Sequence, residues 1–213
     1  MTQGLLFGSG TSMRVGRNGT AFPFSAPVES QQGSIAVTLT CHFARAMVSR
    51  PVAHRAHFRS RIIGLLGRAR DPERCIDELL QVCTTEGGSD GLDAAIDVLA
   101  KAGPLILEYA WEYLQRDIRN WTPSSERAYQ PNDDYWYVLL RAVGRAAVSE
   151  KERFRFISCC AHAESRGIRE GVVEGLHDLG SRAAKDRIRR FAEEDNDDFI
   201  RKIAREALDD LES

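Results

Sequence analysis

Two segments, residues 168–179 and 200–211, repeat one pattern of apolar and charged positions at an offset of 32. In both, the apolar positions fall at i, i+4, i+7, i+8 and i+11, which places them on one stripe of an α-helix. Gly175 and Ala207 occupy the same slot, and such small residues let a neighbouring helix approach closely. The spacing therefore predicts two equivalent helices in successive layers. The stripe of the first copy consists of Ile168, Val172, Gly175, Leu176 and Leu179.

Weaker copies of this pattern precede the two segments, and each copy is followed by signals for a second helix. One copy lies 33 positions earlier, over residues 135–146, and fainter ones lie around 95–102 and 62–66. Ser149 and Glu152 form a capping box at the start of one second helix. Gly180 stands where a helix C-cap glycine belongs. Second helices are expected over 71–83, 104–117, 149–163 and 181–194.

These paired helices resemble HEAT-like repeats, particularly the short bacterial kind first associated with phycobilin lyases. The resemblance is carried by the two copies and the helix between them, and it covers about 80 residues well and about 80 more loosely. It implies an all-α fold, an α-solenoid of about five HEAT-like helical hairpins over residues 51–213, with an exposed concave face for partners. It implies no single activity, because lyases, glycosylases, adaptors and immunity factors all use the repeat.

Two segments break the pattern. Residues 1–50 are expected to be irregular, and Arg17-Asn18-Gly19 between two apolar stretches is typical of a β-hairpin turn. Residues 34–49 fit both the alternation of a strand and the spacing of a helix, and their β-branched content favours a strand before His42 and a helix after it. Residues 118–134 are polar and contain two prolines, which predicts a long loop.

Charge is distributed unevenly along an ordinary globular composition. The net charge is −2 and the pI about 6.2, which favours neither nucleic acid nor an anionic membrane. Residues 1–70 hold nine Arg and one acid, whereas residues 71–134 hold five bases and fourteen acids. These segments either offer partner surfaces or pack side by side and neutralise each other, and we favour the second interpretation.

The candidate chemistry is sparse. Five cysteines at irregular spacing argue against a disulfide framework. Cys159-Cys160 with His162, and Cys41-His42 with two further histidines, lack the spacing of a metal site or the orienting carboxylate of a nucleophile. We therefore predict no catalytic residue, no metal and no cofactor. Without a secretory signal or a run of ~20 apolar residues, the chain is expected in the cytoplasm and not in a membrane.

Binding residues are easier to suggest than catalytic ones. Aromatic and basic residues in the polar loop, namely Arg119, Trp121, Arg127 and Tyr129, have the composition of an interface hot spot. The alternatives are that these aromatics fold back onto the core or stack on nucleobases. Arg153, Arg182 and Arg189 lie on second helices, which usually line the concave side of such repeats. They form either a basic stripe or an ordinary solvated face.

The favoured hypothesis is a non-enzymatic interaction module, an adaptor, scaffold or immunity-type factor that binds a protein partner through the solenoid face and the aromatic loop. The alternative is a nucleic-acid-binding protein similar to the DNA-alkylation-repair glycosylases, in which Trp111, Trp136 and Asp117 would act at the lesion. A bilin-lyase-like enzyme is a third hypothesis, although no residue marks its acid. The oligomeric state is left open.

Overall fold

The structure is a computed structural model, and it describes residues 28–120 and 133–213 of the chain. Within these ranges the chain forms α-helices and no strand, so the predicted all-α class is confirmed. The helices are α1 (Val28–Val48), α2 (Arg55–Leu66), α3 (Pro72–Glu86), α4 (Gly88–Ala100), α5 (Pro104–Asn120), α6 (Asp133–Arg145), α7 (Glu150–Cys159), α8 (Arg166–Leu179), α9 (Arg182–Glu194) and α10 (Asp198–Glu212), with a short 3₁₀ turn at Val52–His54.

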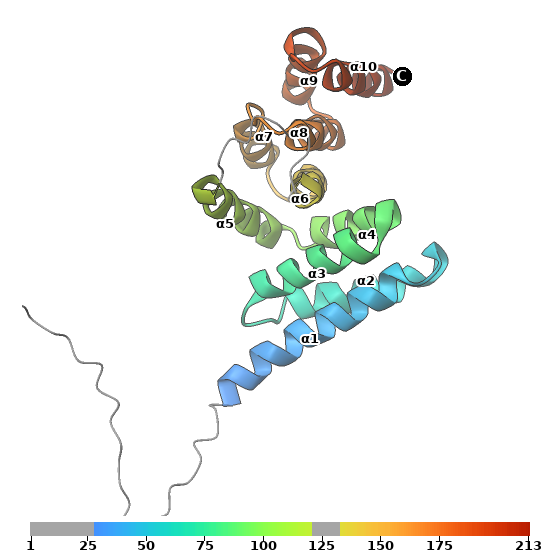
Figure 1. The fold of residues 1–213 in the computed structure, drawn as a ribbon, viewed down its shortest axis with the longest axis vertical. Helices are drawn as coiled ribbons and strands as arrows, with labels where there is room; N and C mark the ends of the chain where they lie inside the picture. Colours follow the sequence, from blue (N-terminus) through green and yellow to red (C-terminus); the bar gives the residue numbers. More distant parts are fainter. Residues whose placement is uncertain (1–27, 121–132) are drawn as a thin grey trace, which may run out of the picture.

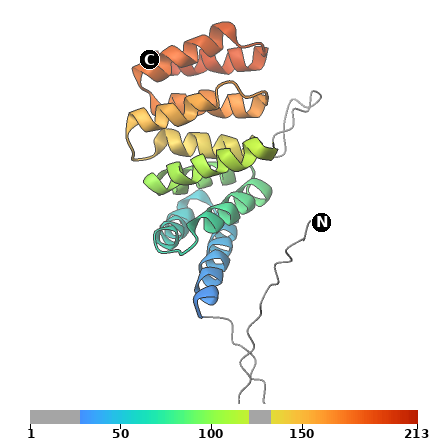
Figure 2. The same ribbon diagram turned by 90° about the vertical axis from the view of Figure 1, so that its left-hand side faces the viewer.

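The helices stack in two rows. Helices α4, α6, α8 and α10 form one row in which each packs on the next, and α5, α7 and α9 lie on the other side of it (Figure 1). Turned by 90°, the same stack runs from α1 at one end to α9 and α10 at the other (Figure 2). The buried apolar side chains form one continuous cluster from Val37 of α1 to Ala207 of α10. Each layer therefore covers the apolar flank of the next.

The helix boundaries follow the capping residues. Ser149 accepts a hydrogen bond from the backbone N–H of Glu152, as the capping box predicts, and Asp71 accepts one from that of Arg74. Gly180 ends α8 in the left-handed conformation, with φ of 65°. The signals used to place the second helices thus mark real helix ends.

The prediction for the N-terminal segment is wrong over its described part. Helix α1 covers Val28–Val48, where the sequence favoured irregular chain with a strand before His42. Val37, Thr40, Ala44 and Met47 are buried at helical spacing, because α1 packs on α3. Burial of this stripe outweighs the β-propensity of the segment. The proposed hairpin at 17–19 lies outside the described residues.

Both ends of the predicted long loop belong to helices. Helix α5 continues to Asn120 and α6 begins at Asp133, so both ends of the expected loop at 118–134 are helical. Residues 121–132 lie outside the described part of the chain.

Ion pairs join the described parts of the two oppositely charged segments. Arg45 of α1 pairs with Glu86 of α3 at 3.0 Å, and Arg59 of α2 pairs with Asp97 of α4 at 2.8 Å. Arg55 is almost fully buried and donates to the Asp90 carboxylate at 3.1 Å. The favoured interpretation of the charge pattern is therefore confirmed for these pairs.

Helices α6 and α8 touch backbone to backbone. Gly167, Gly171 and Gly175 form a stripe along α8 that faces α6. A Cβ atom on Gly175 would lie 2.7 Å from the carbonyl oxygen of Leu140, and one on Gly171 would lie 3.0 Å from Cα of Tyr137. The predicted close approach at Gly175 is therefore present, and larger residues cannot occupy these positions without a shift of one helix.

A buried hydrogen bond joins the N-terminal ends of the same two helices. Asp133 begins α6, is 1% exposed, and accepts a hydrogen bond of 2.6 Å from the hydroxyl of Ser165, the N-cap of α8. The carboxylate also lies against Gly167 in the first turn of α8. A negative charge is favourable there because the first turn presents unpaired N–H groups.

We expect Gly175→Ala to lower the free energy of unfolding by roughly 1–3 kcal/mol, as over-packing does in well-packed cores. Alanine favours a helix over glycine by up to ~1 kcal/mol, so a loss reports the clash with Leu140 and not helix propensity. Urea denaturation followed by circular dichroism measures the change.

Gly64 on α2 provides the matched control, since it is exposed and a Cβ atom there meets nothing within 4 Å. Gly64→Ala should stabilise the chain by up to ~1 kcal/mol. A Gly175→Ala protein that is as stable as this control would contradict the close α6–α8 contact.

Candidate functional site

The structure describes the side chains of three of the seven predicted binding residues. Trp121, Arg127 and Tyr129 lie outside the described residues. Arg119 belongs to α5, but its side chain also lies outside the described part. The remaining three, Arg153, Arg182 and Arg189, come from α7 and α9.

Arg153 makes a structural contact. Its Nη1 donates a hydrogen bond of 2.5 Å to the carbonyl oxygen of Gly144, near the C-terminal end of α6. Its Nε is buried without a hydrogen-bond partner. Arg153 lies one helical turn before Ile157, which is fully buried, so helical spacing alone places Arg153 beside the core stripe of α7.

Arg182 and Arg189 lie on the exposed side of α9, as predicted. The opposite side packs inward through Ala184 and Ile188, both fully buried. Arg189 pairs with Asp186 at 2.9 Å and with Glu212 of α10 at 3.8 Å. Arg153, by contrast, is half-buried and donates to the Gly144 carbonyl oxygen.

A groove opens between α5 and α7. Its volume is about 490 Å³, and it lies in the row of second helices. Trp111 of α5 forms part of the lining and meets Phe156 of α7 edge to face, with ring centroids 5.0 Å apart. The guanidinium of Arg155 lies 5.7 Å from the Trp111 ring centroid, within cation–π range. The groove is lined by Pro104, Leu107, Glu108, Trp111, Ala147, Val148, Ser149, Glu152 and Arg155.

Helix α5 is held on its other side by contacts to α3. The hydroxyl of Tyr109, whose side chain is 1% exposed, donates to the carboxylate of Asp77. Burial, together with this carboxylate, raises the pKa of Tyr109 above its ordinary value. The hydrogen bond fixes the rotation of α5, and therefore the direction in which Trp111 points.

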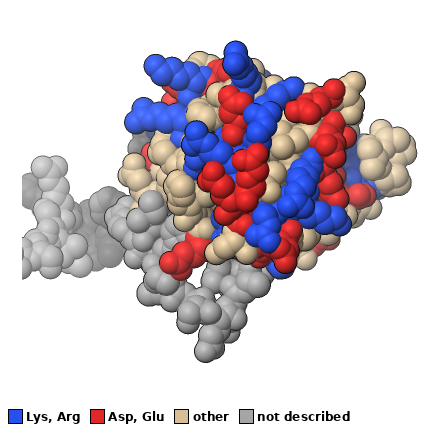
Figure 3. Space-filling model, turned by 90° about the horizontal axis from the view of Figure 1, so that it is seen from above, with Lys and Arg blue, Asp and Glu red and all other residues tan. Residues whose placement is uncertain are grey.

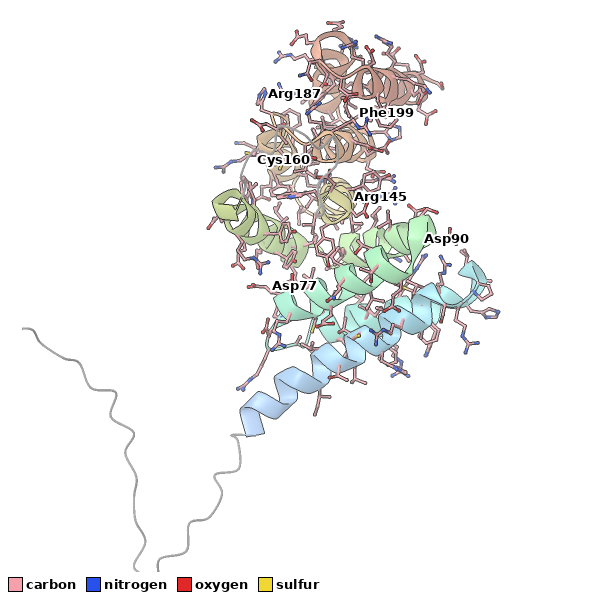
Figure 4. The ribbon with its side chains drawn as sticks, viewed as in Figure 1. Asp77, Asp90, Arg145, Cys160, Arg187 and Phe199 are labelled. Carbon is pink, nitrogen blue, oxygen red and sulfur yellow. The ribbon has the colours of Figure 1, made fainter. Side chains whose placement is uncertain are left out.

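A smaller hollow of about 150 Å³ lies next along the same row, between the end of α7 and α9. Arg187 lines it, with Nη2 3.1 Å from Nε2 of His162 and the guanidinium over the ring of Phe191. Figure 4 shows Arg187 and Cys160 on this side of the stack, whereas Arg145 and Asp90 lie on the opposite side. The arginines that line these hollows are the exposed Arg155 and Arg190 and the half-buried Arg187.

The opposite row carries a network of ion pairs. Arg145 of α6 pairs with Asp97 of α4 at 3.5 Å and with Asp178 of α8 at 2.9 Å. Arg141 also pairs with Asp178, at 2.8 Å, and lies over the Tyr137 ring. These arginines are occupied by contacts within the protein. Seen from the α9–α10 end, positive and negative side chains are likewise interspersed (Figure 3).

Carboxylates crowd a hollow of about 400 Å³ in this row. Glu170 of α8 lines it together with Asp93, Asp133 and Asp134. Burial and the nearby Glu174 raise the pKa of Glu170 above its ordinary value. This excess of negative charge lowers the free energy of unfolding at neutral pH.

We expect Glu170→Gln to raise the free energy of unfolding at neutral pH. The raised pKa means that the folded chain holds the proton more tightly than the unfolded chain. The stabilisation from this proton is present at acidic pH and is lost as the pH rises through the folded-state pKa. The advantage of glutamine should therefore disappear below about pH 4, the ordinary range of a glutamate.

Urea denaturation at neutral and acidic pH measures this difference. Glu193, exposed on α9, supplies the control, in which the same substitution should leave the free energy of unfolding close to that of the wild type. An advantage for Glu170→Gln that is equally large at both pH values would rule out this electrostatic explanation.

Groups with potential catalytic chemistry are scattered or buried. Burial raises the pKa of the Cys83 and Cys160 thiols to about 12, which keeps both protonated near neutral pH. Within residues 28–120 and 133–213, no three His, Cys, Asp or Glu side chains converge to hold a metal ion. Trp136 is 1% exposed and packs edge to face on Tyr113, at 5.2 Å, so it cannot contact a nucleobase from this position.

None of the described helices has the length and apolar character needed to cross a membrane. Comparison of the chain with protein-family models, with curated proteins and with solved structures finds no match.

Sequence reasoning did not identify the groove. The sequence suggested Trp111 for the nucleic-acid hypothesis, not for a groove between two helices. Helical spacing carries a signal for Arg155, because it lies off the buried stripe of Phe156 and Ile157. The pairing of α5 with α7 has no comparable signal, since it depends on how the layers are spaced.

Proposed function

We propose that the chain is a HEAT-like α-solenoid that works as a non-enzymatic interaction module and binds a protein partner through the row α5, α7 and α9. The groove between α5 and α7 is the observation that carries this proposal. It combines an exposed arginine with a half-buried tryptophan, and these residue types dominate the binding energy of protein interfaces.

The stacking supports the solenoid part of the proposal. The equivalent residues Val143, Leu176 and Leu208 are fully or partly buried, although they belong to three successive copies of the repeat. Contacts run mainly between neighbouring layers, from α4 to α6, α8 and α10. This is the arrangement expected of a repeat protein, in which each unit buries its apolar flank against the next.

The charges favour a protein partner over nucleic acid. Duplex DNA needs a basic surface that spans several phosphates. In the row α4, α6 and α8, Arg141 and Arg145 are paired with carboxylates, and in the α5/α7 groove Arg155 stands beside Glu108 and Glu152. Trp136, which the DNA-alkylation-repair alternative would place at the lesion, is buried. The loop residues Arg119, Trp121, Arg127 and Tyr129 remain predicted partner contacts.

The free state of the cysteines favours a reducing compartment. Cys75, Cys83 and Cys160 are buried free thiols, and Cys41 and Cys159 are also free. Free cysteines of this kind are typical of proteins that work in the cytoplasm, which is where we propose that the module acts.

We expect a photoreactive residue at Ala147 to crosslink a protein partner in cells. Ala147 is exposed and lines the groove. Trp111→Ala in the same chain should reduce the adduct at least about tenfold, because a truncated hot-spot residue typically costs 2 kcal/mol or more. Mass spectrometry identifies the partner, and gel quantification of the adduct measures the loss.

Ala56, exposed on α2, is the control position and should give no adduct with the same partner. Because Trp111 also packs on Phe156, Arg155→Ala serves as a second variant: it removes an exposed side chain and should weaken the adduct without loss of helical signal. Absence of an adduct at Ala147 in cells, together with a measurable enzymatic turnover of the purified chain, would overturn the proposal.

A further inference from the structure

We propose that the α5/α7 groove takes a basic amphipathic segment of the partner, with one large apolar side chain against Trp111 and Lys or Arg side chains beside Glu108 and Glu152. This inference rests on the proposed function, since it names the chemistry of the partner at the same groove.

The floor of the groove suits an apolar side chain. Leu107 is 9% exposed, and Trp111 and Val148 are half-buried, so each offers apolar surface without being closed off. The edge-to-face contact with Phe156 holds the Trp111 ring in place. The volume of about 490 Å³ leaves room for one large side chain and its flanking backbone. A rigid floor of this kind lowers the ordering cost of binding.

The rim of the groove selects the charge of the segment. Glu108 comes from α5 and Glu152 from α7, so carboxylates stand on both walls, and both residues are exposed. Neither has an ion-pair partner among the described residues. Arg155 is the basic residue in the lining, and its guanidinium lies over the Trp111 ring. Two carboxylates against one guanidinium leave the lining negative.

Several other carboxylates of the stack are already paired within the protein. Asp97 and Asp178 are each shared by two arginines. Among the described residues Glu108 and Glu152 form no ion pair, so a cation from the partner would meet carboxylates that can pair with it. An acidic segment would meet two like charges, and such repulsion is an effective way to exclude the wrong partner.

Two fluorescein-labelled helical peptides test this inference on the full chain. Both have the same leucine pattern, with lysine at the polar positions of one and glutamate at those of the other, and fluorescence anisotropy measures binding. We expect the lysine peptide to bind at least about tenfold more tightly. Glu108→Gln and Glu152→Gln should each weaken its binding about two- to fivefold, the range of an exposed ion pair. Glu193→Gln on α9 should leave it unchanged.

Equal affinity for the two peptides, preference for the glutamate peptide, binding of neither, or an equal loss in the Glu193→Gln control would overturn the inference. The crosslink at Ala147 separates this failure from failure of the proposed function. An adduct that is lost with Trp111→Ala but is unaffected by both glutamine substitutions would keep the groove as the docking site and exclude a basic segment.

Discussion

The rest of the stack depends on the backbone contact between α6 and α8. Three glycines on one stripe of α8 let the two helix axes approach until a Cβ atom at Gly175 would meet the Leu140 carbonyl. Apolar side chains on either side of the glycines are then fully buried, among them Val172 and Leu176. The Asp133–Ser165 hydrogen bond fixes the register of the pair at its N-terminal end. A one-turn slip would put side chains where only glycine fits and leave a buried carboxylate unpaired.

This tight contact contrasts with the opposite row. Helices α5 and α7 approach each other far less closely and meet through large side chains, with Trp111 of one against Phe156 of the other. The groove at Trp111 lies in this row, between helices that meet through side chains and not through backbone contact.

The sequence was most informative for features that depend on a single helix. The stripe of Ile168, Val172 and Leu176 and the caps at Ser149 and Gly180 require only local spacing and local hydrogen bonds. It misled over α1, because the apolar residues of 35–43 fit strand alternation and helical spacing equally. The helix buries Val37, Ala44 and Met47 and packs on α3, whereas Ile35 and Leu39 are exposed. The groove could not be predicted, because Trp111 and Arg155 are brought together by layer spacing, which no local pattern encodes.

The charge pattern, too, could be interpreted from the sequence only in part, because the ion pairs depend on tertiary structure. Composition marks a basic front and an acidic middle, yet Arg45, Arg55 and Arg59 are each paired with a carboxylate of that acidic middle. We propose that recognition uses charges that folding leaves without such a pair, as at Glu108 and Glu152 in the α5/α7 groove. The sequence alone cannot identify these charges, because the ion pairs join residues of different layers and form only once the layers are assembled.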